Sequence, residues 1–199
     1  MRTVTVTGHG QARAVPDSAV VRVSAVHRAA GVADALAGAD SAARQIVATG
    51  RDHTTPERVG STAVQIWPSH DQQGNPNGFE ARHSLTIRCS DIGAAGALLS
   101  ALAESVGDRL QIEGVSLEVV DRAAAETAAR EAAYADAVGR ATHLALLAGA
   151  ELGEPQDVLE GGVRVGTRLA KGMAAPVSLE LEPGEQGIDA AVTVVFQLR

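Results

Sequence analysis

The chain has 199 residues, a net charge of −7 and 45% hydrophobic residues, a composition that supports a packed core and argues against intrinsic disorder. Only 2% of the residues are aromatic, too few for the base-stacking platform of single-strand nucleic-acid binders. The negative charge also argues against nucleic acid as a partner, because phosphate-binding proteins usually carry a basic face. No apolar run approaches the roughly 20 residues that a membrane helix needs.

Two alternating segments open the chain. Residues 3–7 alternate threonine with valine, and residues 19–25 predict a second half-buried strand. Gly8 and Gly10 lie between them. They do not form a dinucleotide-binding fingerprint, because the third glycine is absent and a strand follows Pro16 where that motif has a helix. We interpret the two glycines as structural, marking a bend or bulge between the strands.

The apolar spacing changes to the helical period of about 3.6 residues in three later segments. Residues 31–49 predict a first helix that ends at Gly50, and a second helix begins at Asp91, whose side chain can cap it. A longer, alanine-rich helix is expected over residues 122–148, with Gly149 at its end. Its alanine-lined flank would allow another helix or a sheet to approach closely.

A hairpin is expected between the first two helices. Residues 62–66 and 79–89 alternate, and the linker 68–78 is rich in Gly, Asn and Pro, which predicts a long solvated tip. On the second strand Glu80 is expected to face water. His83 lies on the apolar side and is interpreted as a hydrogen-bonded core histidine.

The remaining strands follow the second and third helices. Residues 110–119 predict a strand whose apolar phase slips at 113–114, which indicates a β-bulge. Residues 190–198 predict a strong last strand, and residues 177–181 a weaker one before it. The segment 160–176 has loop composition, and we expect a mobile loop there.

This order of elements predicts an α+β fold with a mainly antiparallel sheet, two shorter helices and one long Ala-rich helix. We expect one domain over residues 1–199. Within it, residues 1–120 and 121–199 are candidate sub-lobes.

The sequence predicts no catalytic residues, no metal site and no cofactor. The six histidines show none of the spacings of zinc motifs. His70 and His83 flank the hairpin, but if Pro68 lies opposite Phe79, His83 lies about 13 Å further along its strand, too far for one shared ion. Cys89 is the lone cysteine, and its strand context predicts a buried, inert thiol.

The expected hairpin tip holds the remaining candidates. His70 and Asp71, with Glu80, could form an acid–base group, but no nucleophile is visible beside them and a loop gives poor support. The ring of Trp67, next to Pro68, either covers the sheet edge or contacts another subunit. Trp67, Pro68, His70 and Asp71 are therefore the candidate interaction surface.

Several stretches together resemble the SIMPL-domain family, formerly a domain of unknown function (DUF541). Members begin with a strand, a G-x-G, a polar run, Pro-Asp and a second strand, which here are Gly8, Gly10, Pro16 and Asp17 in VTVTGHGQARAVPDSAVVRVSA. Further stretches agree with the family's later strands and long helix, namely GFEARHSLTIRCSD, IEGVSLEVVD and AAREAAYADAVGRATHLALLAGAELG. The resemblance spans nearly the whole chain.

The resemblance implies a protein of undefined role. Bacterial members are mostly exported or envelope proteins, one group being known as periplasmic immunogenic proteins, and related proteins form large ring-like or channel-like homo-oligomers. No catalytic residues are established for the family. We therefore expect a non-enzymatic, self-assembling protein with an interaction or stress-related role, whose subunit surfaces would be the alanine flank of the long helix and the hairpin edge.

Two alternatives stay open. One is a small-ligand or metal-dependent enzyme that uses the His70-Asp71 loop; the other is an adaptor that binds one protein partner by strand addition at the hairpin edge. No signal peptide is visible before Thr3, so we expect a cytoplasmic protein from the sequence as given, or a periplasmic or envelope protein if a leader was removed.

Overall fold

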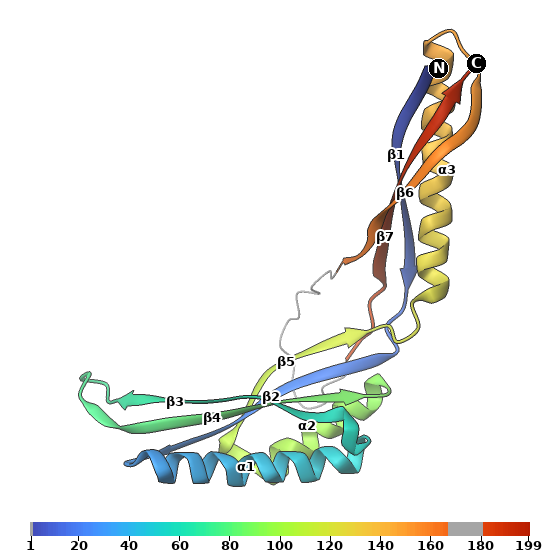
Figure 1. The fold of residues 1–199 in the computed structure, drawn as a ribbon. Helices are drawn as coiled ribbons and strands as arrows, with labels where there is room; N and C mark the ends of the chain where they lie inside the picture. The colour runs from blue at the N-terminus through green and yellow to red at the C-terminus, as the bar shows by residue number, and fades with distance from the viewer. Residues whose placement is uncertain (1, 167–180) are drawn as a thin grey trace. The chain divides into compact units, whose positions relative to one another are not determined.

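A computed structural model describes residues 2–166 and 181–199, which form seven β-strands, three α-helices and two short 3-10 helices. The fold is α+β, as the sequence predicts. The strands form two antiparallel sheets, each within a compact unit that has its own apolar core (Figure 1).

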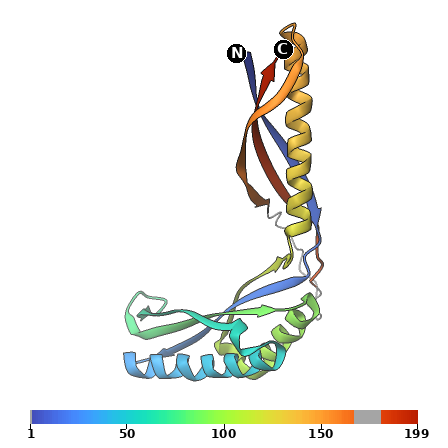
Figure 2. The ribbon, with the colours of Figure 1, turned by 45° about the vertical axis from the view of Figure 1, so that its right-hand side comes forward.

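The first unit combines the two ends of the chain with the long helix. Of the described residues it contains 2–16, 119–166 and 184–199. Its strands are ordered β1-β7-β6, with bounds β1 Arg2–Ala14, β7 Gln186–Leu198 and β6 Leu152–Gly166. Helix α3, Ala123–Leu147, lies along β1 and β7 (Figure 2). Because β1 pairs with β7 along its whole length, it belongs with the last strand and not with the other residues of the 1–120 segment.

Gly8 and Gly10 let α3 lie directly on the backbone of β1. A Cβ on Gly8 would lie 2.1 Å from the carbonyl oxygen of Ala133, and one on Gly10 would lie 2.2 Å from that of Ala129. The expected bend is wrong, since both glycines sit inside an unbroken strand, opposite Val192 and Ala190. Their role is structural, but the reason is the close approach of the helix.

The helix contributes a face of small side chains to this contact. Its buried residues recur every fourth position, as Ala129, Ala133, Ala137, Ala141 and Ala145. On the sheet, the apolar residues of β7 complete the core, namely Ile188, Ala190, Val192, Val194 and Phe196. The alanine flank is therefore covered by the unit's own sheet, and the expectation that it serves as a subunit surface is wrong.

The second unit contains residues 17–118 and, of the later described residues, 181–183. Its strands are ordered β3-β4-β2-β5, with bounds β3 Val59–His70, β4 Pro76–Cys89, β2 Ser18–Ala29 and β5 Leu110–Glu118. Two helices, α1 Val32–His53 and α2 Ile92–Val106, cover one face of this sheet (Figure 2). The short 3-10 helices are η1 Pro56–Arg58 and η2 Gly107–Arg109.

The core of this unit confirms several predictions. Asp91 caps α2 by accepting a hydrogen bond from the backbone N–H of Ala94 at 2.6 Å. Cys89 is 1% exposed, and burial raises the pKa of its thiol, with the Asp91 carboxylate adding to the shift. The bulge in β5 is also present, because the register with β2 shifts at Glu113.

Other boundaries differ from the predictions. Helix α1 does not end at Gly50 but continues to His53. Gly50 lies inside the helix and faces the sheet, where a Cβ would lie 3.2 Å from the side chain of Ile87. The hairpin strands pair as far as His70 and Pro76, so the tip is a short turn and not a long loop. Residues 160–166 belong to β6, and the remainder of the expected loop, with the strand expected at 177–181, lies almost wholly outside the described residues.

None of the helices in residues 2–166 and 181–199 is long and apolar enough to cross a membrane.

Gly10→Ala should lower the free energy of unfolding by about 3 kcal/mol, because the new methyl group would overlap the backbone of α3. Urea unfolding followed by far-UV circular dichroism measures this loss. Gly60→Ala is the matched control, since it adds a methyl group to a strand glycine with no atom within 4 Å. Equal stability of the two variants would contradict the close contact between α3 and β1.

Candidate functional site

The predicted interaction residues lie at the far end of the β3–β4 hairpin. Trp67 is half-buried, and the guanidinium carbon of Arg82 lies 5.4 Å from the centre of its ring, a cation–π contact. Pro68 lies opposite Phe79, as assumed from the sequence, and Pro68 and His70 are exposed.

Asp71 organises the turn between the two strands. Its Oδ1 accepts hydrogen bonds from the backbone N–H groups of Gln73 at 2.9 Å and Asn75 at 2.8 Å. Its own N–H donates to the carbonyl of Asn75, and Gly74 takes a φ of 85° between them. The pKa of Asp71 is lowered, chiefly by the hydrogen bond from the Asn75 backbone. A carboxylate held in this way serves the turn and is a poor general base.

The structure does not assemble the His70, Asp71 and Glu80 group. Glu80 lies opposite Trp67, so His70 is three residues further along the hairpin, or about 10 Å. His83 lies opposite Val64, which places it about 20 Å from His70. Its Nε2 is 2.7 Å from the Oγ of Ser61, so the expected hydrogen bond is present, but His83 is half-buried and not part of the core as expected. In the part of the chain that is described, no three His, Cys, Asp or Glu residues gather as a metal site.

The face of the four-stranded sheet opposite α1 and α2, here called the outer face, carries a polar network that the sequence analysis missed. Glu80 is 7% exposed, not solvated as expected, and its Oε2 accepts a hydrogen bond from the Nε of Arg28 at 2.5 Å. The Arg28 side chain is 73% exposed. A buried carboxylate with a charged partner avoids most of the cost of burial.

Arg82 is the centre of this network. Its Nη2 donates to the Oε1 of Gln111 at 2.7 Å, and its Nη1 lies 3.9 Å from the Oε1 of Glu113. Its Nε is the one buried side-chain polar atom that has no hydrogen-bond partner within the described residues. The Arg82 guanidinium is thus held by residues of β5 and by the ring of Trp67, while its Nε donates no hydrogen bond within the described residues.

The bulge in β5 brings Glu113 onto two serines. Ser24 is fully buried. Its Oγ donates a hydrogen bond to the carboxylate of Glu113 and lies 2.8 Å from the Oγ of Ser84. Ser84 donates to the same carboxylate oxygen at 3.3 Å. The extra residue that the bulge adds to β5 therefore directs the Glu113 carboxylate toward the two central strands of the sheet, β2 and β4.

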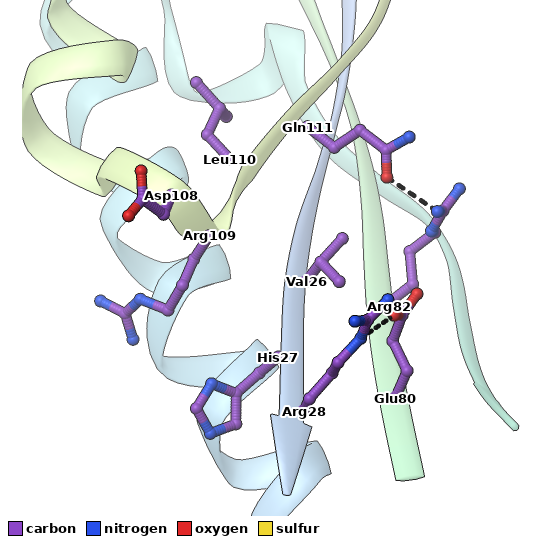
Figure 3. Close-up of a pocket in the computed structure, with 9 residues that line it drawn as sticks. All are labelled: Val26, His27, Arg28, Glu80, Arg82, Asp108, Arg109, Leu110 and Gln111. Carbon is purple, nitrogen blue, oxygen red and sulfur yellow. Dashed lines mark hydrogen bonds and ion pairs between the residues drawn. The ribbon is translucent and has the colours of Figure 1, made fainter. Parts of the chain in front are cut away.

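A pocket of about 510 Å³ lies at the end of this network, where β5 begins (Figure 3). Three strands and η2 contribute its lining residues, namely Val26, His27, Arg28, Glu80, Arg82, Asp108, Arg109, Leu110 and Gln111. Arginine is the dominant charged residue type, so the pocket suits an anionic group. The alternation of residues in β4 and the predicted bulge in β5 were the features of the sequence that pointed to a polar outer face. The pairing of β2 with β5 could not be predicted, because it joins segments that are far apart in the chain.

Glu113→Ala should lower the free energy of unfolding by about 1–3 kcal/mol, because it removes the carboxylate that pairs with buried Ser24. Glu113→Gln keeps an acceptor and should lose less. Urea unfolding followed by the fluorescence of Trp67, the single tryptophan, measures both. Glu104→Ala, an exposed glutamate on α2, is the control, and a loss equal to that of Glu113→Ala would exclude a special role for the bulge.

The Asp71 turn should respond to acid. Because the pKa of Asp71 is lower in the folded turn than in the unfolded chain, its carboxylate stabilises the turn at neutral pH, and this contribution is lost as the pH falls through the folded value. We expect the amide chemical shift of Asn75 to titrate with a midpoint below the ordinary aspartate range. Asp71→Asn should abolish the titration; a midpoint at the ordinary value would contradict the observed hydrogen bonds.

Comparison with known proteins gives the family. The two curated relatives are the 26 kDa periplasmic immunogenic proteins of Brucella melitensis and Brucella abortus, each 27% identical over 220 residues, which cover 98% of this chain and 84% of the relative. The model of the SIMPL family, a protein of unknown function (DUF541), matches residues 4–196.

Solved structures add little. A hydantoinase/carbamoylase family amidase from Burkholderia ambifaria is 21% identical with a TM-score of 0.26, and the match covers 64% of this chain but 34% of the amidase. An unknown protein from Galdieria sulphuraria is 13% identical with a TM-score of 0.22, covering 89% and 81% of the two chains. Neither likeness is close enough to indicate a shared fold. The family match, in contrast, spans nearly the whole sequence, and this chain belongs to the SIMPL (DUF541) family.

Proposed function

We propose that this chain is a non-enzymatic protein that acts as a homo-oligomer, with an interaction or stress-related role in the bacterial envelope. The location rests on the Brucella relatives, whose names describe periplasmic proteins, and it replaces the cytoplasmic expectation. The proposal of self-association rests on one feature of the second unit, the edge strand β3.

Strand β3 is an unprotected sheet edge. It runs from Val59 to His70 and, among the described strands, pairs with β4 alone, and Val59–Ser69 contains no charged residue. Val64 is 57% exposed and Ile66 is 36% exposed. Natural proteins usually protect such edges with charges or a cover, because an open strand readily pairs with another chain.

The other three edge strands are protected. Side chains of α3 occupy the edge of β1, where Asp136 accepts from the N–H of His9 and Arg140 donates to the carbonyl of Thr7. Strand β6 carries three acidic residues and a proline, namely Glu154, Pro155, Asp157 and Glu160, and β5 has its bulge. Strand β3 also has a bulge near its start and Pro68 near its end, but it has no charged residue from Val59 to Ser69, and this uncharged stretch between them supports β3 as the surface that another strand covers.

A second copy of the chain is the simplest partner for this edge. Antiparallel pairing of β3 with its own copy is a two-fold arrangement in which both chains use the same surface. It would extend each four-stranded sheet across the interface and bring the exposed side chains of Val64 and Ile66 against the partner. Trp67 and Pro68, predicted as interaction residues, lie toward one end of the same strand.

The enzyme alternative lacks such support. Asp71 is engaged in the turn and Glu80 is paired with Arg28 on another strand, so the acid–base group is not assembled. We therefore propose an interaction function and no reaction.

Val64→Lys should reduce the assembly to a smaller species, because it places a charge in the uncharged edge. Light scattering over a range of protein concentrations measures the mass. Leu146→Lys is the matched control, since it makes the same kind of change at a 73% exposed leucine on α3. A wild-type protein that is monomeric at all concentrations, or an assembly that Val64→Lys leaves intact, would contradict the proposal.

A further inference from the structure

Strand β2 extends beyond its neighbour β5 and leaves a second, shorter open edge. Its pairing with β4 continues from Ala19 to Ala29, but its pairing with β5 stops at Ala25, opposite Leu110. Among the described strands, residues 26–29 therefore have a partner on one side only. In an antiparallel sheet, alternate N–H and C=O groups of such a segment point outward and are free to pair with another strand.

The open edge lies in the pocket described above. Val26, His27 and Arg28 are three of its lining residues, and its volume of about 510 Å³ is within the usual range of ligand sites. Strand β5 begins at Leu110, opposite Ala25, and no other strand within residues 2–166 and 181–199 pairs with this edge. An added strand would lie in line with β5.

Arginines flank this edge on both faces of the sheet. Arg28 and Arg82 lie on one side of β2, and Arg109 lies on the other side together with His27 (Figure 3). The side chains of an added strand would alternate between these two faces. Acidic side chains at alternate positions would meet Arg28 and Arg82, and an acidic residue between them would face Arg109.

Two acidic residues also line the pocket, but they leave a cationic excess. The carboxylate of Glu80 is already paired with Arg28. The Nη2 of Arg109 donates a hydrogen bond to the neutral Oε1 of Gln45, and the buried Nε of Arg82 has no partner among the described residues. Asp108, on η2, is the one other carboxylate in the lining.

We propose that residues 26–29 bind an extended acidic peptide segment as an additional antiparallel strand, with the arginines at positions 28, 82 and 109 recognising its carboxylates. The main-chain pairing selects an extended peptide over a compact anion. The arginines select acidic over basic side chains. This site is separate from the β3 edge, because β4 and β2 lie between β3 and β5 in the sheet.

Fluorescence anisotropy with a labelled peptide that has successive glutamates between flanking valines tests the proposal, because glutamates then fall on both faces of the added strand. Two further peptides and a competitor give the comparison: the same sequence with lysine for glutamate, the same sequence N-methylated at alternate residues, and free glutamate as the competitor. We expect only the unmethylated acidic peptide to bind well, with an affinity that falls as salt increases. Equal binding of the N-methylated peptide would overturn strand addition.

Arg109→Gln should weaken binding by about threefold, because it removes one partly exposed charge contact without touching a buried carboxylate. Arg28→Gln should weaken it at least as much, and circular dichroism checks that the loss of the Glu80 partner does not unfold the sheet. Arg44→Gln, on α1, is the control that should bind as the wild type.

Hydrogen exchange locates the bound peptide. Protection of the amides of residues 26–29 on addition of the acidic peptide supports the assignment. Protection of Val59–Ser69 instead, no detectable binding, or displacement by free glutamate at equal concentration would each overturn it.

Discussion

The direct contact of helix backbones with neighbouring strands is the constraint on which this structure depends. Aromatic residues make up 2% of the chain, so few large side chains are available to fill the space between layers. The layers must approach closely, and glycine and alanine allow it. In the first unit Gly8 and Gly10 bring β1 onto the alanine ladder of α3. In the second unit the ring of His27 lies where a Cβ of Gly38, on α1, would be.

Because close packing of this kind occupies one face of a sheet with small apolar residues, polar side chains are placed on the opposite face. In the second unit the helices cover one face, and the outer face carries the arginine, glutamate and serine network. The bulge at Glu113 joins three strands through a single carboxylate, which accepts from Ser24 and Ser84 and lies beside Arg82. Burial of Glu80 and Ser24 in this network makes their partners obligatory, because an unpaired buried polar group is costly.

The sheet edges connect this architecture to function. Strand β3 exposes an uncharged edge along most of its length, while β2 exposes a short edge surrounded by arginines. The first suits an identical uncharged strand, and the second an acidic one. The two edges therefore differ in the partner that they favour, although both would use the same main-chain hydrogen bonds.

Local patterns in the sequence determined the fold class, the order of most elements, the apolar faces of the second and last strands, the cap at Asp91 and the bulge near Glu113. These features depend on neighbours in the chain, whose spacing is visible in one sequence. Strand β6 was missed, because Glu154, Pro155, Asp157 and four glycines give it the composition of a loop.

The candidate sites were decided by tertiary structure. Trp67, Pro68, His70 and Asp71 lie close together on one hairpin, as the sequence indicates, and the partners of Trp67 and Asp71 lie in the same hairpin, whereas the outer-face network joins residues of distant strands. Glu80 was expected in water and is buried, because Arg28 on β2 lies beside it. Gly8 and Gly10 were expected at a bend and lie in a straight strand, because α3 arrives from more than a hundred residues away. A single sequence records which residues can approach closely, whereas the register of distant strands determines which of them do.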